Sequence, residues 1–282
     1  MTVVLASDLD RTLIFSGRFF TDEHGARSTG RVCVERLDGR EISFVTARSH
    51  AILEELARSG TLLPVTSRTV EQYRRIELPG PPPPFAVCAN GGRLLVGGVE
   101  DEQYREELVR DLSHTSAPVA DVWAILEVAA ARRADAGRPL KAMRVADGLF
   151  CYTVDETDAD PAWAQALAQA VDPLGWGVTR QMRKVYLVPR PLTKARAVRA
   201  VAERTRASHI VAAGDAHLDI SMLHLADEAI RPAHGELHDE GWSAPRVSVT
   251  ASQGVMAGQE IAEWLLERHR QHACVRSGQT TR

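Results

Sequence analysis

Short apolar runs alternate with amphipathic stretches over much of the chain. The run from Val3 to Leu9 is almost continuous and rich in β-branched residues, which is typical of a strand buried on both faces of a parallel sheet. Runs of the same character occur at 62–65, 85–89 and 209–213. Between 47 and 59 the apolar residues recur at helical spacing, and Gly60 follows as a stop signal. This alternation predicts an α/β fold with a doubly wound, Rossmann-like parallel sheet.

Two stretches interrupt the alternation. Residues 15–46 have no helical period, but two β-rich runs flank Asp38-Gly39, a strong signal for a tight turn, and we expect an inserted β-hairpin. Residues 91–189 combine three amphipathic helical patterns with a second hairpin signal at Asp147-Gly148, followed by an apolar strand-like run. This second stretch predicts a separate α+β unit inserted into the sheet domain.

The strand and helix alternation returns after the inserted unit. Helices are expected over 194–204, 221–226 and 260–268, with strands at 209–213, 229–230 and 247–249. We therefore assign 1–90 and 190–268 to one core domain and 91–189 to the inserted unit. The polar tail, 269–282, is expected to be disordered.

Composition narrows the class of protein. With 282 residues the chain is long enough for about two domains. The 34 basic and 37 acidic residues give a formal charge of −3, so no overall field attracts nucleic acid or an anionic membrane. No run of about 18 apolar residues could cross a bilayer. The beginning lacks a basic leader, and the four cysteines are widely spaced, so we expect a cytoplasmic protein with reduced thiols and no nucleic-acid or membrane partner. The sequence carries no indication of an oligomeric state.

Acidic residues gather where the predicted strands end. Asp8 and Asp10 end the first strand, and Asp215 and Asp219 follow the strand at 209–213. Ligands of open α/β sheets bind outside the carboxyl ends of the strands, and four carboxylates would meet there if these strands are neighbours. Such a concentration of negative charge is costly without a cation, and oxygen ligands without histidine or thiolate select Mg²⁺. The sequence thus predicts a magnesium site.

The order of these residues resembles the haloacid dehalogenase superfamily of aspartate-nucleophile phosphohydrolases, over nearly the whole chain. The first motif corresponds to Asp8-Leu9-Asp10-Arg11-Thr12-Leu13, and the later motifs to Lys194 and to Gly214-Asp215-Ala216-His217-Leu218-Asp219. The segment between Asn90 and Lys194 resembles the type-two α/β cap of sugar-phosphate phosphatases related to those for sucrose phosphate and mannosylglycerate phosphate. Arg11 and Leu218 depart from the commonest residues of the family, which are glycine and asparagine.

The second motif, a strand-end threonine followed by a small residue and arginine, has two candidates. Phe44-Val45-Thr46-Ala47-Arg48 and Pro64-Val65-Thr66-Ser67-Arg68 both match it. We favour Thr66, because helix 47–59 fits the crossover that precedes the second strand of the sheet. The 24 residues from Thr66 to Asn90 also leave room for a helix and a connection before the next strand.

The resemblance implies a role for each acid. Asp8 would be the nucleophile that forms an aspartyl-phosphate, and Asp10 the general acid and base. The metal would be held by the carboxylates of Asp8 and Asp215 and by the backbone carbonyl of Asp10. Asp219 would hydrogen-bond Lys194 or a metal-bound water.

The remaining positions would bind the phosphoryl group. Thr66 would donate its hydroxyl and Ser67 an N–H to the phosphoryl oxygens, while Lys194 would neutralise the charge shared between phosphate and Asp8. Arg68 is left open between a substrate contact and a surface ion pair. Asn90 is left open between a polar hinge and a simple turn.

These assignments predict a Mg²⁺-dependent phosphatase for a small phosphorylated metabolite, with a sugar or polyol phosphate as first choice. One alternative is phosphoryl transfer to another acceptor, as in a phosphotransferase or mutase, which uses the same acids. Another is a metabolite-binding regulator without catalysis. The presence of Asp8, Asp10, Lys194 and Asp215 together favours the enzyme, since a binding protein has no need of a nucleophile.

Overall fold

The fold is described by a computed structural model that covers residues 3–20, 30–156 and 160–277. The chain divides into two compact units, which we call the core unit (up to 100 and from 194 onward) and the cap unit (101–193). From the sequence we predicted that the boundary between the core domain and the inserted unit follows residue 90. That boundary lies ten residues further on, because residues 93–96 pair with the preceding strand of the core unit and residues 99–100 pair with 95–96 in turn.

The core unit is built on a parallel sheet of five strands in the order β15-β14-β13-β1-β5. The strands are β1 (Val3–Ser7), β5 (Leu62–Pro64), β13 (His209–Ala213), β14 (Glu228–Arg231) and β15 (Val247–Val249). Ser7, at the end of β1, lies opposite Ala213 on one side and Pro64 on the other. The carboxyl ends of three neighbouring strands therefore lie at one level.

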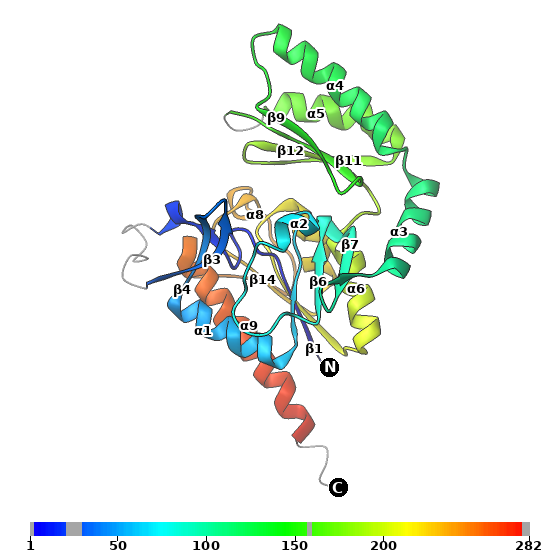
Figure 1. Cartoon of the computed structure of the whole chain (residues 1–282). Helices are drawn as coiled ribbons and strands as arrows, with labels where there is room; N and C mark the ends of the chain where they lie inside the picture. Colours follow the sequence, from blue (N-terminus) through cyan, green and yellow to red (C-terminus); the bar gives the residue numbers. More distant parts are fainter. Residues whose placement is uncertain (1–2, 21–29, 157–159, 278–282) are drawn as a thin grey trace. The chain divides into compact units, whose positions relative to one another are not determined.

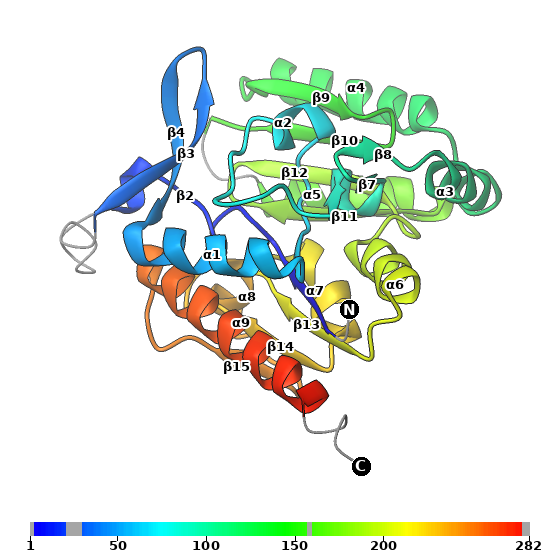
Figure 2. The same cartoon turned by 60° about the horizontal axis from the view of Figure 1, so that its bottom comes forward.

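Helices cover both faces of this sheet, as the doubly wound pattern predicts (Figure 1). They are α1 (Ala47–Ser59), α6 (Lys194–Thr205), α7 (Ile220–Leu225) and α9 (Gly254–Ser277), and the short α8 (Glu236–Asp239) follows β14. Helices α1 and α9 lie side by side on one face, and α6 lies on the other (Figures 1 and 2). From the sequence we expected a disordered tail from residue 269. This prediction is wrong for 269–277, because α9 continues through these residues. Residues 278–282 lie outside the described residues.

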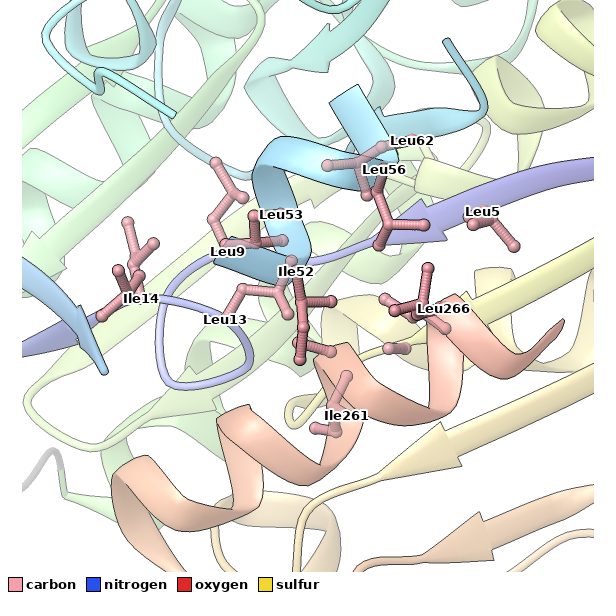
Figure 3. Close-up of a cluster of buried hydrophobic side chains, with 14 of the residues drawn as sticks. Leu5, Leu9, Leu13, Ile14, Ile52, Leu53, Leu56, Leu62, Ile261 and Leu266 are labelled. Atoms are coloured by element: carbon pink, nitrogen blue, oxygen red, sulfur yellow. The ribbon is translucent and has the colours of Figure 1, made fainter. Parts of the chain in front are cut away.

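The main hydrophobic core lies between β1, α1 and α9 (Figure 3). Helix α1 contributes Ile52, Leu53 and Leu56, all at most 2% exposed, and α9 contributes Ile261 and Leu266. Three residues just after β1 belong to the same cluster: Leu9, Leu13 and Ile14. The loop that follows β1 is therefore anchored in the core of the domain.

The inserted hairpin predicted near residue 38 is present. Strands β3 (Arg31–Leu37) and β4 (Arg40–Thr46) pair antiparallel, with β2 (Phe15–Ser16) on the other side of β4 (Figure 2). Asp38 and Gly39 both have positive φ, 50° and 74°, the conformation that a tight two-residue hairpin turn requires. Residues 21–29 of the expected insertion lie outside the described residues.

The strand expected at 85–89 does not join the parallel sheet as a full member. β6 (Phe85–Cys88) pairs antiparallel with β7 (Arg93–Val96), which in turn pairs with β8 (Val99–Glu100). A single parallel bridge from Val65 to Val87 links it to the end of β5. The connection between β5 and β6 holds only the short helix α2 (Val70–Tyr73), so no long crossover helix positions β6.

The cap unit is a four-stranded antiparallel sheet with helices. Its elements are α3 (Glu102–Thr115), α4 (Val119–Asp135), β9 (Ala142–Ala146), β10 (Phe150–Val154), α5 (Pro161–Val171), β11 (Trp176–Gln181) and β12 (Lys184–Pro189). The strand order is β11-β12-β10-β9, and α4 and α5 pack against one face (Figure 1). The turn at Asp147-Gly148 is the predicted one, whereas β11 was not foreseen, because glycine and polar residues break its apolar pattern.

In the described part of the chain, no helix combines the length and the apolar character needed to span a membrane. Cys33, Cys88 and Cys151 are free thiols. Cys274 lies outside the described side chains.

Thr46 provides a test of the fold without touching the site. It is the N-cap of α1, and its hydroxyl oxygen accepts the backbone N–H of Ser49 at 3.0 Å. We expect Thr46→Ala to lower the free energy of unfolding by about 1 kcal/mol, and Thr46→Ser to lose only a small part of this, because serine keeps the capping oxygen. Urea unfolding measures both values. Equal stability of the alanine variant and the wild type would contradict the capping role.

Candidate active site

Three neighbouring strands deliver the site residues to one edge of the core sheet. The backbone N–H of Asp8 donates to the carbonyl of Ala213 at 2.9 Å, and the N–H of Val65 donates to the carbonyl of Ser7 at 2.8 Å. Asp8, Thr66 and Asp215 therefore follow directly from strands that pair with one another. Thr46 ends β4, which lies outside the parallel sheet.

The loop after β1 is a tight turn around the carbonyl of Leu9. The backbone N–H groups of Leu13 and Ile14 both donate to this oxygen at 2.9 Å. Arg11, at the position where the family commonly has glycine, has a φ of 64°, which explains why glycine suits this position. The hydroxyl of Thr12 donates to Oδ2 of Asp8 at 3.2 Å. Thr12 belongs to the first motif, but the sequence suggested no contact for it.

His234 holds the same loop from outside. Its Nδ1 accepts the backbone N–H of Gly254 at 3.1 Å, so the proton must sit on Nε2, which donates to the carbonyl of Arg11 at 2.8 Å. Burial lowers the pKa of His234 to about 4. A neutral imidazole thus fixes the backbone at Arg11.

Lys194 is a buried cation placed between two carboxylates. It is the first residue of α6 and only 2% exposed, and its Nζ lies 2.6 Å from Oδ1 of Asp8 and 2.5 Å from Oδ1 of Asp219. Burial alone lowers the pKa of a lysine, but here the two carboxylates together raise the pKa of Lys194 above its ordinary value. Lys194 is therefore charged, and its ammonium group bridges the carboxylates of Asp8 and Asp219.

Asp219 organises the loop that carries Asp215. Its Oδ2 accepts the backbone N–H groups of Asp215 and Ala216, both at 3.0 Å, while its Oδ1 binds Lys194. A Cβ at Gly214 would lie 2.5 Å from the Cβ of Asp219, so only glycine allows this approach. Asp219 thus joins the loop of Asp215 to Lys194, which is one of the two partners expected for it.

Asp215 is the carboxylate of the cluster that has the fewest partners among the described residues. It is 1% exposed, and among the described residues neither of its oxygens has a hydrogen-bond donor; Nε of Arg11 lies 3.7 Å from Oδ2. Oxygens of Asp8, Asp215 and Asp219 lie within 4.8 Å of one another. Burial, and then repulsion by Asp8 and Asp219, raise the pKa of Asp215 well above its ordinary value. Burial likewise raises the pKa of Asp8 to about 7, although Lys194 opposes the rise.

Thr66 sits in a loop that is fixed by its own backbone. It is fully buried, its hydroxyl oxygen accepts the N–H of Arg68 at 3.1 Å, and its carbonyl accepts the N–H of Asn90 at 3.1 Å. Asn90 has a φ of 56°, so it is a left-handed turn residue that lies within the core unit. Ser67 is half-buried between Thr66 and Arg68. The turn after β6 thus supports the turn after β5.

Arg68 binds two carboxylates. Its Nε and one terminal nitrogen donate to the two oxygens of Asp10, both at 2.7 Å, and its other terminal nitrogen donates to Oε1 of Glu35 at 2.7 Å. The arginine side chain is 15% exposed, that of Asp10 49%, and that of Glu35 2%. Arg68 therefore forms a partly buried ion pair in this structure. Glu35 was not foreseen, because it lies in the hairpin that the sequence marks as an insertion.

Comparison with known proteins identifies the fold. No family model matches the chain, and no curated protein matches it significantly by sequence. Among solved structures, the sucrose-phosphatase of Synechocystis sp. PCC6803, determined with sucrose and phosphate, aligns at a TM-score of 0.63 with 17% identity, covering 94% of this chain and 98% of that one. The chain has the haloacid dehalogenase fold.

Two further structures of the superfamily agree. A phosphatase of Bacteroides thetaiotaomicron aligns at a TM-score of 0.54 with 16% identity, covering 97% of this chain and 96% of the other. A subclass IIB sugar phosphatase aligns at 0.55 with 12% identity, covering 94% and 100%. The coverage includes both units, which confirms the predicted Rossmann-like core with an inserted cap.

Within this haloacid dehalogenase fold, the carboxylate cluster fits a divalent cation. Three buried acids share one buried ammonium group, and both oxygens of Asp215 lack a hydrogen-bond donor among the described residues. Buried charges of this kind need a partner. Carboxylate oxygens without histidine or cysteine are the donor set of a hard cation such as Mg²⁺. The cluster of Asp8, Asp215 and Asp219 could therefore hold a metal ion.

The raised pKa values give this cluster a testable pH dependence. Because the folded protein binds protons at Asp8 and Asp215 more tightly than the unfolded chain, the metal-free protein should lose stability as the pH rises from about 4 to about 7. Mg²⁺ competes with these protons, so its stabilising effect should be larger at pH 8 than at pH 5.5. At one hundred times its Kd, the gain at pH 8 is about 2.7 kcal/mol.

The variant Asp215→Asn tests whether Mg²⁺ binds at this cluster or at other acidic side chains. We expect this variant to be more stable than the wild type at pH 8 without metal, because one repelling charge is gone, and to lose most of the response to Mg²⁺. Thermal unfolding with EDTA or Mg²⁺ measures both effects. The control is Glu41→Gln, which removes an exposed carboxylate from β4. A full Mg²⁺ response in Asp215→Asn would rule out a metal at this cluster.

Proposed function

We propose that the protein is a Mg²⁺-dependent phosphatase that hydrolyses a small phosphorylated metabolite through an aspartyl-phosphate. The observation that carries this proposal is the pairing of Asp8 with Lys194 beside the buried Asp215, whose oxygens have no hydrogen-bond donor among the described residues, at the carboxyl ends of adjacent parallel strands. Each oxygen of Asp8 has one hydrogen-bond donor, Lys194 for Oδ1 and Thr12 for Oδ2. These contacts orient the carboxylate and leave lone pairs for attack on phosphorus.

In the first step, an oxygen of Asp8 forms a bond to phosphorus, and the bond between phosphorus and the ester oxygen breaks. Asp10 gives a proton to that oxygen, which leaves as the alcohol. To carry this proton, Asp10 gives up one of its two hydrogen bonds from Arg68. Lys194 neutralises the negative charge between Asp8 and the phosphoryl group, and Asp219 keeps the ammonium in place. Positioning and charge compensation are the main needs of phosphoryl transfer.

In the second step, Asp10 takes a proton from water while the water oxygen bonds to phosphorus. The bond between phosphorus and Asp8 breaks, which restores the carboxylate and releases inorganic phosphate. Thr66 and Ser67 are proposed to donate to the phosphoryl oxygens from the loop that Asn90 supports. A bound Mg²⁺, held by Asp8, Asp215 and the carbonyl of Asp10, would supply positive charge to the phosphoryl oxygens.

A sugar or polyol phosphate is the proposed substrate class. One support is the sucrose-phosphatase structure with bound sucrose and phosphate, which shares the fold. Another lies in the cap unit, where Arg144, Tyr152 and Tyr186 lie in register across three strands. Nζ of Lys184 lies 5.4 and 5.7 Å from the centres of the two tyrosine rings. Aromatic faces beside cationic donors suit a hydroxylated anionic compound.

The test is a panel of phosphorylated metabolites assayed for free phosphate with Mg²⁺. We expect the wild type to release phosphate, and Asp8→Asn to lose activity by a factor on the order of 10³ or more, because asparagine is not a nucleophile. Thr46→Ala, which removes the cap of α1 and a hydrogen bond to Gln259 away from the site, should keep normal turnover. Phosphate that appears on an added alcohol instead of in solution would favour a phosphotransferase or mutase. Equal turnover by Asp8→Asn and the wild type would refute the nucleophile.

A further inference from the structure

Glu35 is a buried acid on the inserted hairpin. Neighbouring residues of a strand normally point to opposite faces, yet Val34 and Glu35 are both buried, at 1% and 3% exposure. The register of β3 against β4 shifts on both sides of Glu35, which marks a β-bulge. Bulges redirect side chains and are frequent beside active sites. The bulge is therefore the local feature that turns this carboxylate inward.

The backbone fixes where the carboxylate lies. The N–H of Glu77 donates to the carbonyl of Val34 at 2.7 Å, and Glu35 forms an isolated antiparallel bridge with Ile76. These contacts join β3 to the segment that follows α2, which comes from the same loop as Thr66 and Arg68. The hairpin is thus attached at the level of Glu35 to the part of the core unit that carries the second motif.

Both carboxylate oxygens of Glu35 have polar partners. The hydroxyl of Ser43 donates to Oε2 at 2.5 Å, and Arg68 donates to Oε1 at 2.7 Å. Nε of Arg75 lies 3.5 Å from Oε1. A buried carboxylate with two guanidinium groups and a hydroxyl has one stable position, and it restrains its partners in return.

The guanidinium of Arg68 transmits this restraint to Asp10. Three of its nitrogens are used, two on Asp10 and one on Glu35. Because the guanidinium group is planar and rigid, fixing one edge on Glu35 fixes the plane in which the other edge meets Asp10. The side chain of Asp10 is itself half-exposed. An ion pair of such a residue with an unanchored arginine would be mobile and weak.

We propose that Glu35 is a positioning residue for the general acid and base, acting through Arg68, and that the inserted hairpin is a working part of the active site. The proposal rests on the proposed function, since it assumes that Asp10 transfers the proton. It predicts that the loss of Glu35 impairs the step in which the leaving group is protonated, and that substrate binding is largely retained.

The experiment compares two kinds of phosphate ester. Glycerol 2-phosphate has an alkoxide leaving group that needs a proton, whereas p-nitrophenyl phosphate has a leaving group stable enough to depart without one. Glu35→Met fills the space of glutamate but cannot accept hydrogen bonds, and Glu35→Gln keeps one acceptor for Arg68. For glycerol 2-phosphate we expect kcat to fall about 10-fold in Glu35→Met and less in Glu35→Gln, with KM changed by less than about 2-fold. For p-nitrophenyl phosphate we expect kcat to change by less than about 3-fold.

Two controls distinguish an effect on the position of Asp10 from a general loss of protein stability. Glu41→Met changes an exposed acid of β4, in the same hairpin, and should leave both substrates unaffected. In an Asp10→Asn background, Glu35→Gln should cause almost no further loss, because the group that it positions is gone. Equal losses on both esters in the glutamine and methionine variants, or full additivity with Asp10→Asn, would overturn the proposal.

A structural readout keeps this test independent of the proposed activity. If the wild type releases no phosphate from any ester, the proposed function fails, and crystal structures of the wild type and Glu35→Met still decide whether Glu35 positions Arg68. We expect the two hydrogen bonds from Arg68 to Asp10 in the wild type and their loss in the variant. An unchanged arrangement of Arg68 and Asp10 in Glu35→Met would refute the positioning role.

Discussion

The central constraint of this structure is the burial of three carboxylates around one ammonium group. Asp8, Asp215 and Asp219 are each at most 5% exposed, and Lys194 compensates only two of them directly. A folded domain tolerates such an imbalance when protons or a cation complete it. The surrounding structure keeps these charged side chains in position. The loop after β1 is anchored in the core, and the oxygens of Asp219 accept hydrogen bonds from the backbone and from Lys194. The stability of the domain and the chemistry of the site therefore depend on the same contacts.

The sequence predicted the parts that depend on strand ends and turns. Buried parallel strands have long apolar runs, and acids directly after them must lie at the edge of the sheet, so Asp8 and Asp215 could be placed together. The hairpin turn at Asp38-Gly39 and the stop at Gly60 follow from backbone conformations that few residues adopt. The choice of Thr66 over Thr46 rested on topology, and β5 does pair with β1 whereas β4 lies in another sheet.

Other features depend on tertiary contacts that no local pattern encodes. β6 was assigned to the parallel sheet from its apolar run, but a buried strand has the same composition whichever neighbour it pairs with. The last helix continues past 268 because polar side chains of its end make tertiary contacts: Nδ1 of His269 lies 3.2 Å from the hydroxyl of Thr61, and Arg270 donates to Glu55 at 2.9 Å. Glu35 offered no signal at all, because a glutamate in a polar hairpin is ordinarily solvated and only the bulge buries it.

Arg11, one of the departures from the family pattern, and the inserted hairpin each bring a charged group to one of the motif acids. Arg11 adopts a left-handed backbone that glycine adopts without strain, which costs roughly 1 kcal/mol, and it places a guanidinium 3.7 Å from the otherwise uncompensated Asp215. The inserted hairpin contributes a carboxylate that holds Arg68 against Asp10. Both features therefore add charged partners beside the acids at the strand ends. Such charged side chains change the hydrogen bonds and the charge balance of Asp10 and Asp215, although they come from outside the strand ends that position these acids.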